Sequence, residues 1–241
     1  MATPDIYWPR DVLSPRQVTP ELVPATISGG RTITSVEKII KVDAGYWQIT
    51  LDQIPYASKE HKRAWRAVAG ILQGRFGTIA VPVYDTDGAP WPLDGNGNPI
   101  TDYPDEPHSD GTLFSDGTGY DQPVIVAEIY ANAGLGAVYV TILFTFGDAD
   151  GPQPGQFFSV ANRLYRIIGV TASAASPTQV FTCKITPPLR EPIFLGDTAE
   201  FDDPRCICCM ATDTEMMSAA DAYNGTSTGK VTFVEKINVD E

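Results

Sequence analysis

Residues 33–84 decide the fold, and they read ITSVEKIIKVDAGYWQITLDQI, then PYASKEHKRAWRAVAGILQGR, then FGTIAVPVY. Alternating apolar and polar residues over 32–42 and 46–54 predict two strands, with Asp43-Ala44-Gly45 as the tight turn between them. Residues 78–84 predict a third strand, in which Pro82 indicates an edge position or a bulge. The stretch therefore predicts a small sheet with a helix laid across it.

The helix is predicted over residues 58–73, with Ser58 as its N-cap and Gly74 ending it. Its apolar face recurs at spacings of three and four residues: His61, Ala64, Trp65, Val68, Ala69 and Leu72. We expect Trp65 to be the central packing residue. The other face is basic, and we interpret it as a contact surface for the acidic loop of a neighbouring subunit. The residues of this contact are Lys59, Lys62, Arg63 and Arg66.

The remaining segments complete a chain that is mainly β with one helix. Residues 1–32 carry a proline every four to six residues, which predicts an extended arm rather than a helix or a central strand. Over 122–204, short apolar runs between turns, one of them at Ala161–Asn162, predict a second β domain, a small barrel or sandwich. The last run, KVTFVEKINVDE, predicts a strand that pairs back into the first domain. That domain then comprises residues 33–84 and 205–241.

Charge is segregated along the chain, whose formal net charge is −13. Between Phe76 and Asn162 there is no Lys or Arg, so all 17 basic residues lie outside this stretch. Within it, residues 85–121 are rich in Gly, Pro and Asp, which predicts a long acidic loop without a period. The negative charge of this stretch repels the phosphate backbone of a nucleic acid. A solvated loop that keeps the protein soluble is the simplest interpretation.

Membrane and secretory signals are missing from the sequence. No run of about 18 apolar residues predicts a membrane span. The first residues, MATPDIYWPRD, lack the basic and apolar regions of a secretory signal.

No catalytic motif is present, so we predict that the chain is not an enzyme and needs no cofactor. Neither His61 nor His108 has a recognisable catalytic partner. Cys206 and Cys208 would face one side of a strand and Cys209 the other, which favours buried strand residues over a zinc site or disulfide.

The only motif typical of ion binding begins at Asp94 and resembles the start of a calcium loop. Its weak candidate ligands are Asp94, Asn96, Asn98, Asp102 and Asp105. Pro99 stands where an EF-hand requires glycine, and Asx-rich turns use the same residue types. Trp91, Tyr103 and Tyr120 in the same loop also suit a carbohydrate site. A carbohydrate- or Ca²⁺-binding module is therefore an alternative interpretation of this loop.

Two segments resemble tail proteins of long, non-contractile-tailed bacteriophages. The first is GYWQITLDQIPYASKEHKRAWRAVAGILQGRFGTIAVPVYD. The second is GQFFSVANRLYRIIGV followed by VFTCKITPPLREPIFLGDTAEFDDPRCICCMATD, with Gly155-Gln156 where the pattern has Gly-Asp. Together the quoted segments comprise 91 of the 241 residues, and their motifs are structural. The family that they resemble is that of distal tail proteins and related minor tail proteins.

This resemblance implies a structural virion protein that assembles in the host cytoplasm and resides in the virion tail. Six copies would form a ring, with belt-like β-sandwich domains around a channel. The tail tube protein would lie above the ring and hub and fibre proteins below, and DNA would pass through without specific binding. Acidic walls would let DNA slide. The residues expected on the lumen or facing an adjacent ring are Asp85, Asp87, Asp94, Asp102, Asp105, Glu106 and Asp110.

Overall fold

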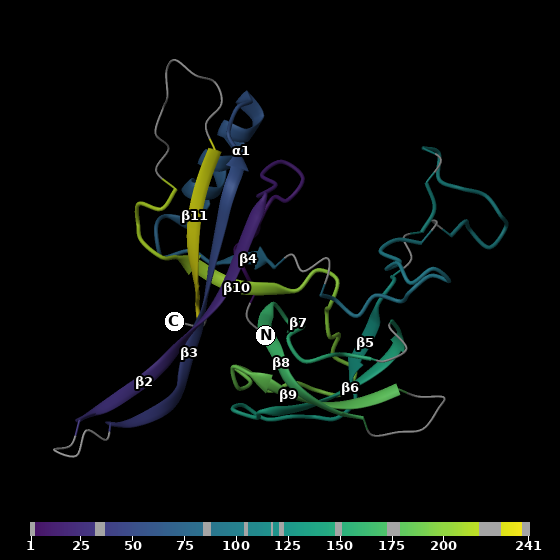
Figure 1. Ribbon diagram of the computed structural model, residues 1–241. Helices are drawn as coiled ribbons and strands as arrows, with labels where there is room; N and C mark the ends of the chain where they lie inside the picture. The colour runs from purple at the N-terminus through teal and green to yellow at the C-terminus, as the bar shows by residue number, and fades with distance from the viewer. Residues whose placement is uncertain are drawn as a thin grey trace. The chain divides into compact units, whose positions relative to one another are not determined.

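The computed structural model describes residues 3–31, 37–83, 88–103, 106–116, 118–120, 123–147, 151–172, 179–216 and 228–237. Within these ranges the fold is mainly β, with one helix and two sheets (Figure 1). The chain divides into two units. The first comprises Met1–Tyr84, Ala161–Leu164 and Asp203–Glu241, and the second comprises Asp85–Val160 and Tyr165–Asp202. The predicted fold class is confirmed.

The first unit is built on a six-stranded sheet of the described strands. Its order is β1 (Ile6–Tyr7), β4 (Ile79–Pro82), β10 (Arg205–Met210), β11 (Thr228–Glu235), β3 (Glu37–Pro55) and β2 (Gln17–Arg31). Strand β1 pairs parallel with β4, and the other neighbours are antiparallel. The last strand, β11, pairs with β3, so the prediction that the end of the chain returns to the first sheet is confirmed.

The predicted turn at Asp43-Ala44-Gly45 is wrong, because β3 is one strand across these residues. Opposite them, β2 pairs Val23 with Tyr46 and Ala25 with Val42, so residues 43–45 form a bulge facing Pro24. Pro24 has no N–H to donate to the ladder and is tolerated at a bulge. A Cβ at Gly45 would lie 2.9 Å from the carbonyl oxygen of Val23. The glycine signal thus marks a close backbone approach instead of a turn.

The proline-rich segment supplies both edges of this sheet, β1 and β2. Pro20 is registered opposite Ile49, and a proline is tolerated in an edge strand whose missing donor faces solvent. Trp8, which follows β1, is buried and donates from Nε1 to the carbonyl of Leu13 at 2.8 Å. The segment is therefore extended, as expected, and lies on its own unit.

Strand β4 lies inside the sheet, although Pro82 predicted an edge or a bulge. The neighbouring strand β1 pairs only with Ile79 and Ala80. Pro82 lies past the end of β1, where no neighbouring strand needs an N–H donor, as expected for a proline in a sheet. Ile79 and Ala80 of β4 are nevertheless paired on both sides.

Helix α1 (Lys59–Leu72) begins and packs as the sequence predicts. The side chain of N-cap Ser58 accepts from the backbone N–H of His61, and the backbone N–H of Ser58 donates to Nδ1 of His61. Trp65 is buried and donates from Nε1 to the carbonyl of Met216 at 2.9 Å. Its ring lies against Gly229 of β11, where a Cβ would come within 2.8 Å.

The second unit contains a curled five-stranded sheet. Its order is β5 (Val126–Ile129), β6 (Tyr139–Phe146), β9 (Gln179–Thr186), β8 (Arg163–Ala172) and β7 (Phe157–Val160). Ala199 donates to the carbonyl of Ala127 in β5 at 2.9 Å, and Glu200 exchanges two backbone hydrogen bonds with Ser159 in β7. The segment around Ala199 therefore bridges the two outer strands and covers both sheet edges.

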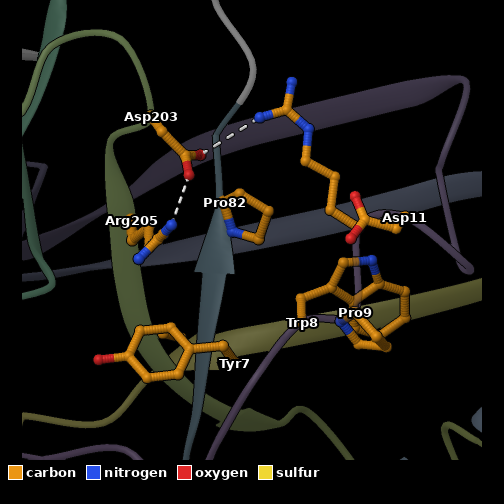
Figure 2. Close-up of a pocket in the computed structure, with 9 residues that line it drawn as sticks. Tyr7, Trp8, Pro9, Asp11, Pro82, Asp203 and Arg205 are labelled. Atoms are coloured by element: carbon orange, nitrogen blue, oxygen red, sulfur yellow. Dashed lines mark hydrogen bonds and ion pairs between the residues drawn. The ribbon is translucent and has the colours of Figure 1, made fainter. Parts of the chain in front are cut away.

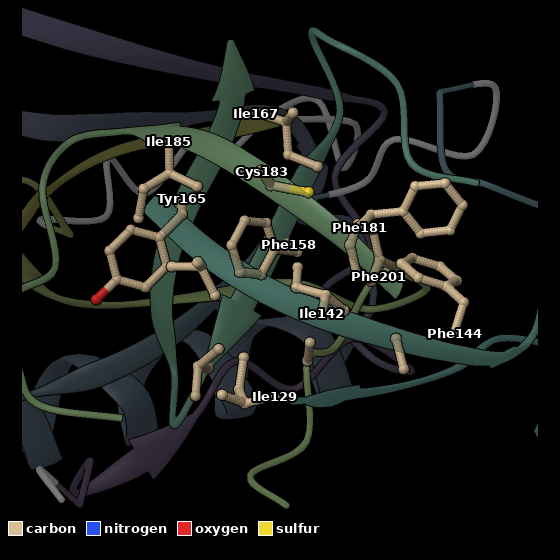
Figure 3. Close-up of a cluster of buried hydrophobic side chains, with 14 of the residues drawn as sticks. Ile129, Ile142, Phe144, Phe158, Tyr165, Ile167, Phe181, Cys183, Ile185 and Phe201 are labelled. Atoms are coloured by element: carbon tan, nitrogen blue, oxygen red, sulfur yellow. The ribbon is translucent and has the colours of Figure 1, made fainter. Parts of the chain in front are cut away.

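Large side chains fill the inside of this curled sheet (Figure 3). Phe158 and Phe201 stack with ring centroids 5.3 Å apart, and Tyr165 lies against Phe158 at 5.6 Å. The turn between β7 and β8 is Ala161–Asn162, with φ values of 50° and 64°. Both are positive, which is the geometry of a type I′ hairpin, so the predicted two-residue turn is confirmed.

Candidate interaction surfaces

The acidic segment of the second unit is organised by its own carboxylates. Oδ1 of Asp94 accepts from the backbone N–H groups of Asn96 and Asn98, each at 2.8 Å. Oδ2 accepts from Nδ2 of Asn98 at 3.1 Å. These bonds, above all the one from the backbone of Asn98, lower the pKa of Asp94. The oxygens of Asp94 thus hold an Asx turn, which Leu93 and Pro99 close as a bridged pair.

This geometry differs from that of a calcium loop, in which the same oxygens converge on an ion. Asp102 is exposed, and Asp105 lies outside the described residues. In the described part of the chain, no three His, Cys, Asp or Glu side chains are grouped closely enough to hold a metal ion. Asp94 and Asn98 therefore bind each other in a turn, and the described donors do not fit a calcium site.

A six-residue repeat follows, which the sequence prediction of an aperiodic loop missed. Ser-Asp-Gly-Thr occurs at 109–112 and again at 115–118. In each copy one Asp oxygen accepts from the Thr two residues later. For Asp110 the distances are 3.0 Å to the backbone nitrogen and 2.6 Å to Oγ1 of Thr112. The hydrogen bonds from Thr112 and Thr118, above all those from their hydroxyl groups, lower the pKa of Asp110 and Asp116.

The same repeat brings three aromatic rings together. His108, Phe114 and Tyr120 are spaced by six residues, and their centroids lie 4.7–5.3 Å apart in edge-to-face pairs. The hydroxyl of Tyr120 is 3.0 Å from Nδ1 of His108. Phe114 is 42% exposed and Tyr120 is 51% exposed. We call His108, Phe114 and Tyr120 the aromatic trio.

The three aromatic residues of the alternative carbohydrate reading do not share an environment. Trp91 is 8% exposed and belongs to the core of the second unit. Tyr103 is exposed, and Tyr120 belongs to the aromatic trio. Trp91 therefore anchors the acidic segment by packing and is not a platform for a sugar.

Of the acidic residues expected on a lumen or an adjacent ring, the structure describes four, and three of these are exposed. Asp102, Glu106 and Asp110 are exposed, and Asp94 is half-buried. Asp85, Asp87 and Asp105 lie outside the described residues. We define the acidic insertion as residues 85–121, which carry nine acidic residues and no Lys or Arg.

The predicted basic contact residues lie on α1 in the first unit. Lys59, Arg63 and Arg66 are exposed, and Lys62 is half-buried with Nζ 5.8 Å from the ring centroid of Tyr56. Positions 59, 62, 63 and 66 form a single stripe along the helix. We call these four residues the basic stripe.

A pocket of about 340 Å³ lies beside the N-terminal segment in the first unit (Figure 2). Asp203 joins two guanidinium groups, with Nη2 of Arg205 at 2.6 Å and Nη1 of Arg10 at 3.8 Å. The guanidinium carbon of Arg205 lies 5.2 Å from the ring centroid of Tyr7. These contacts tie β1 and the following turn to β10. None of the nine residues that line the pocket supplies a His, Cys, Ser or Thr.

An exposed apolar surface at one end of the curled sheet was not predicted from the sequence. Most of it lies on two loops that the antiparallel bridge between Ala133 and Ile193 joins, and Tyr139 is the first residue of β6. Its members are Tyr130, Leu135, Tyr139, Phe194 and Leu195, each more than half exposed. Exposed apolar groups gathered in this way are typical of protein contact sites.

The cysteines lie in the sheets. Cys183, Cys206 and Cys208 are buried, Cys209 is half-buried, and all four thiols are free. Burial raises the pKa of Cys183 to about 12 and raises the pKa of Cys208. They therefore pack as small apolar side chains.

Comparisons with known proteins give no relative for this chain. No protein-family model matches it, and no curated protein matches it either. No helix among the described residues is long and apolar enough to span a membrane. The function must therefore be argued from the surfaces above.

Proposed function

We propose that the chain is a structural subunit of a bacteriophage tail. It forms a ring at the distal end that joins the tail tube to the hub and fibres and surrounds the DNA channel. The resemblance of residues 45–85 and 155–213 to distal tail proteins supports this proposal. The shape of the β2–β3 hairpin supports it independently.

The observation that carries the proposal is a ribbon in which two strands, among the described residues, pair only with each other. Strand β11 pairs with β3 only from Gln48 to Pro55. Beyond the bulge, β2 and β3 continue from Ala25 paired with Val42 to Arg31 paired with Glu37. Figure 1 shows this outer part of the hairpin running on past β11. We call the paired residues 25–31 and 37–42 the ribbon.

A two-stranded ribbon is marginally stable in water by itself. Such a ribbon is normally supported by a third strand or by a face packed against it. Strand β11 does not supply this support, because its pairing with β3 ends at Gln48. In a ring, each ribbon would lie on the next copy, which supplies that support. Contacts of this head-to-tail kind give a ring when the rotation from one copy to the next closes, and an open filament when it does not.

The acidic insertion fits the same assembly. Its exposed carboxylates, including Asp102, Glu106 and Asp110, would face the channel or an adjacent ring. Like charge repels the phosphate backbone of passing DNA, so DNA would not be held.

The test is to measure the assembly state with and without the ribbon. Val23 and Tyr46 are registered partners, so Asn-Gly can replace residues 24–45 and close a type I′ turn. The wild-type chain should give ring-sized particles by light scattering and negative-stain electron microscopy. The shortened chain should be monomeric with its thermal unfolding little changed.

Two results would contradict the proposal. A wild-type chain that stays monomeric at high concentration, or rings that persist without the ribbon, would remove its support. A monomer that binds carbohydrates on a glycan array would instead favour the carbohydrate-binding alternative.

A further inference from the structure

Within the described part of the chain, Lys62 of the basic stripe contacts the ring of Tyr56, and the other three residues of the stripe are exposed. No ion pair involving Lys59, Arg63 or Arg66 forms with a described residue. Glu60 is the only acidic residue among the fourteen of the helix. The chain as a whole has 30 acidic and 17 basic residues, so this surface is opposite in sign to its surroundings. An acidic partner would balance it.

The acidic insertion has the complementary charge and a fixed conformation. Asp94, Asp110 and Asp116 are each held by hydrogen bonds from residues two to four positions later. A surface that is already ordered loses less entropy when it binds. The hydrogen bonds within these turns do not neutralise the carboxylates. Asp110 and Asp116 are exposed and Asp94 is half-buried, so their negative charge is available to a partner.

The aromatic trio adds a second type of contact that suits arginine. Phe114 and Tyr120 present exposed rings within the same repeat as Asp110 and Asp116. Guanidinium groups bind carboxylates and also stack on aromatic faces. Arg63 and Arg66 could therefore contact both groups at once.

We propose that the basic stripe of one copy binds the acidic insertion of a neighbouring copy. This inference rests on the proposed ring and names one of its contacts between subunits. The occupant that we assign is a second copy, because its insertion carries nine acidic residues and no Lys or Arg and so complements the stripe locally. The insertion is the part of a second copy with the largest run of unbalanced acid.

The experiment uses two full-length variants and their mixture. The helix variant carries Lys59→Glu, Arg63→Glu and Arg66→Glu, and it leaves Lys62 in place because that side chain contacts Tyr56. The insertion variant replaces all nine acidic residues: Asp102→Lys, Asp105→Lys and Glu106→Lys, together with asparagine at the other six, Asp85→Asn, Asp87→Asn, Asp94→Asn, Asp110→Asn, Asp116→Asn and Asp121→Asn. Asparagine retains the Oδ1 acceptor, so the Asx turns are kept while their charge is removed.

Each variant alone should associate at least about tenfold more weakly than wild type, because its two surfaces no longer differ in sign. An equimolar mixture should recover assembly, since the acidic helix of one variant meets the basic insertion of the other. A control matched to the helix variant carries Arg16→Glu, Lys184→Glu and Lys230→Glu. It changes the net charge by the same amount as the helix variant and should assemble like wild type. Circular dichroism and thermal melts check that every variant is folded.

Several outcomes would overturn this contact. Rings of the helix variant as stable as those of the matched control would show that the stripe is not at the interface. A mixture that fails to recover assembly would exclude the pairing with the insertion. If the wild-type chain binds a duplex DNA oligonucleotide and the helix variant does not, the basic stripe is a nucleic-acid site instead. A monomeric wild type contradicts the proposed ring as well, whereas the other outcomes leave the ring intact.

Discussion

Replacing Gly229 by alanine tests how α1 is seated on the sheet. The new Cβ would lie 2.8 Å from Cζ3 and 2.9 Å from Cη2 of Trp65. The ring has little freedom to move, because Nε1 donates to the carbonyl of Met216 and the edge contacts Tyr56 at 5.8 Å between centroids. The clash therefore has to be relieved by displacing the helix or the strand.

The expected cost follows from two opposing effects. Overpacking a well-filled core costs about 1–3 kcal/mol. Alanine is favoured over glycine within a strand by about 0.5–1 kcal/mol, which offsets part of that cost. The net destabilisation is then about 1–2 kcal/mol, or a decrease in Tm of about 2–8 °C for a chain of this size.

A double-mutant cycle with Trp65→Leu makes the prediction specific. Leucine is shorter than tryptophan, so Gly229→Ala should lose most of its cost in the Trp65→Leu background. Denaturant unfolding of the four proteins measures the coupling. If the two substitutions add to within about 0.5 kcal/mol, the Trp65–Gly229 contact is not what seats the helix.

Four further changes test other parts of the structure. Ala161→Gly should stabilise the chain by about 1 kcal/mol, because Ala161 has φ +50°; an unchanged Tm would contradict a strained turn. Arg163→Met should cost about 3 kcal/mol or more in denaturant unfolding, since Arg163 is 2% exposed and donates to the carbonyls of Lys236 at 2.6 Å and Ile237 at 3.0 Å. The control Arg16→Met, at an exposed site, should cost less than about 0.5 kcal/mol. Cys183 should resist a thiol reagent at pH 8 until the chain is unfolded, because its pKa is raised to about 12. The lowered pKa of Asp94 contributes stability that is present above its unfolded value of about 3.9 and is lost as pH falls through the folded value, so its carboxyl ¹³C resonance should titrate below that in an unfolded control.

Local signals in the sequence predicted the helix and one turn well. Ser58, the apolar spacing around Trp65 and the turn at Ala161–Asn162 act over a few residues, so their effects can be read without the rest of the chain. Gly45 and Pro82 gave misleading signals for the opposite reason. Each is explained by a strand from elsewhere in the sequence, β2 for Gly45 and β1 for Pro82.

The surfaces were harder to predict than the elements. Charge alone identified the basic stripe and the acidic insertion. The aromatic trio could have been found from the repeated Ser-Asp-Gly-Thr, because equal spacing of His108, Phe114 and Tyr120 places them in equivalent positions. The apolar surface around Leu135 and Leu195 could not, because it depends on two distant loops being paired. Trp91 was misread as a surface ring, because its burial depends on the core of the second unit.

The edges of the first sheet limit how copies of this chain can join. At one edge, β1 has only two residues, which is too short to template another strand. At the other edge, Pro20 interrupts the row of donors that an added strand would need. In the second unit, the segment around Ala199 already pairs with both outer strands, β5 and β7. Continuous β-sheet between copies is therefore disfavoured along these edges, whereas the ribbon, where β11 no longer pairs with β3, leaves strand edges open. If copies assemble as proposed, they would join through side-chain surfaces and the ribbon. Contacts of that kind have a defined geometry and can close, whereas strand addition at an open edge propagates without limit. A protein that builds a ring of fixed size needs this arrangement.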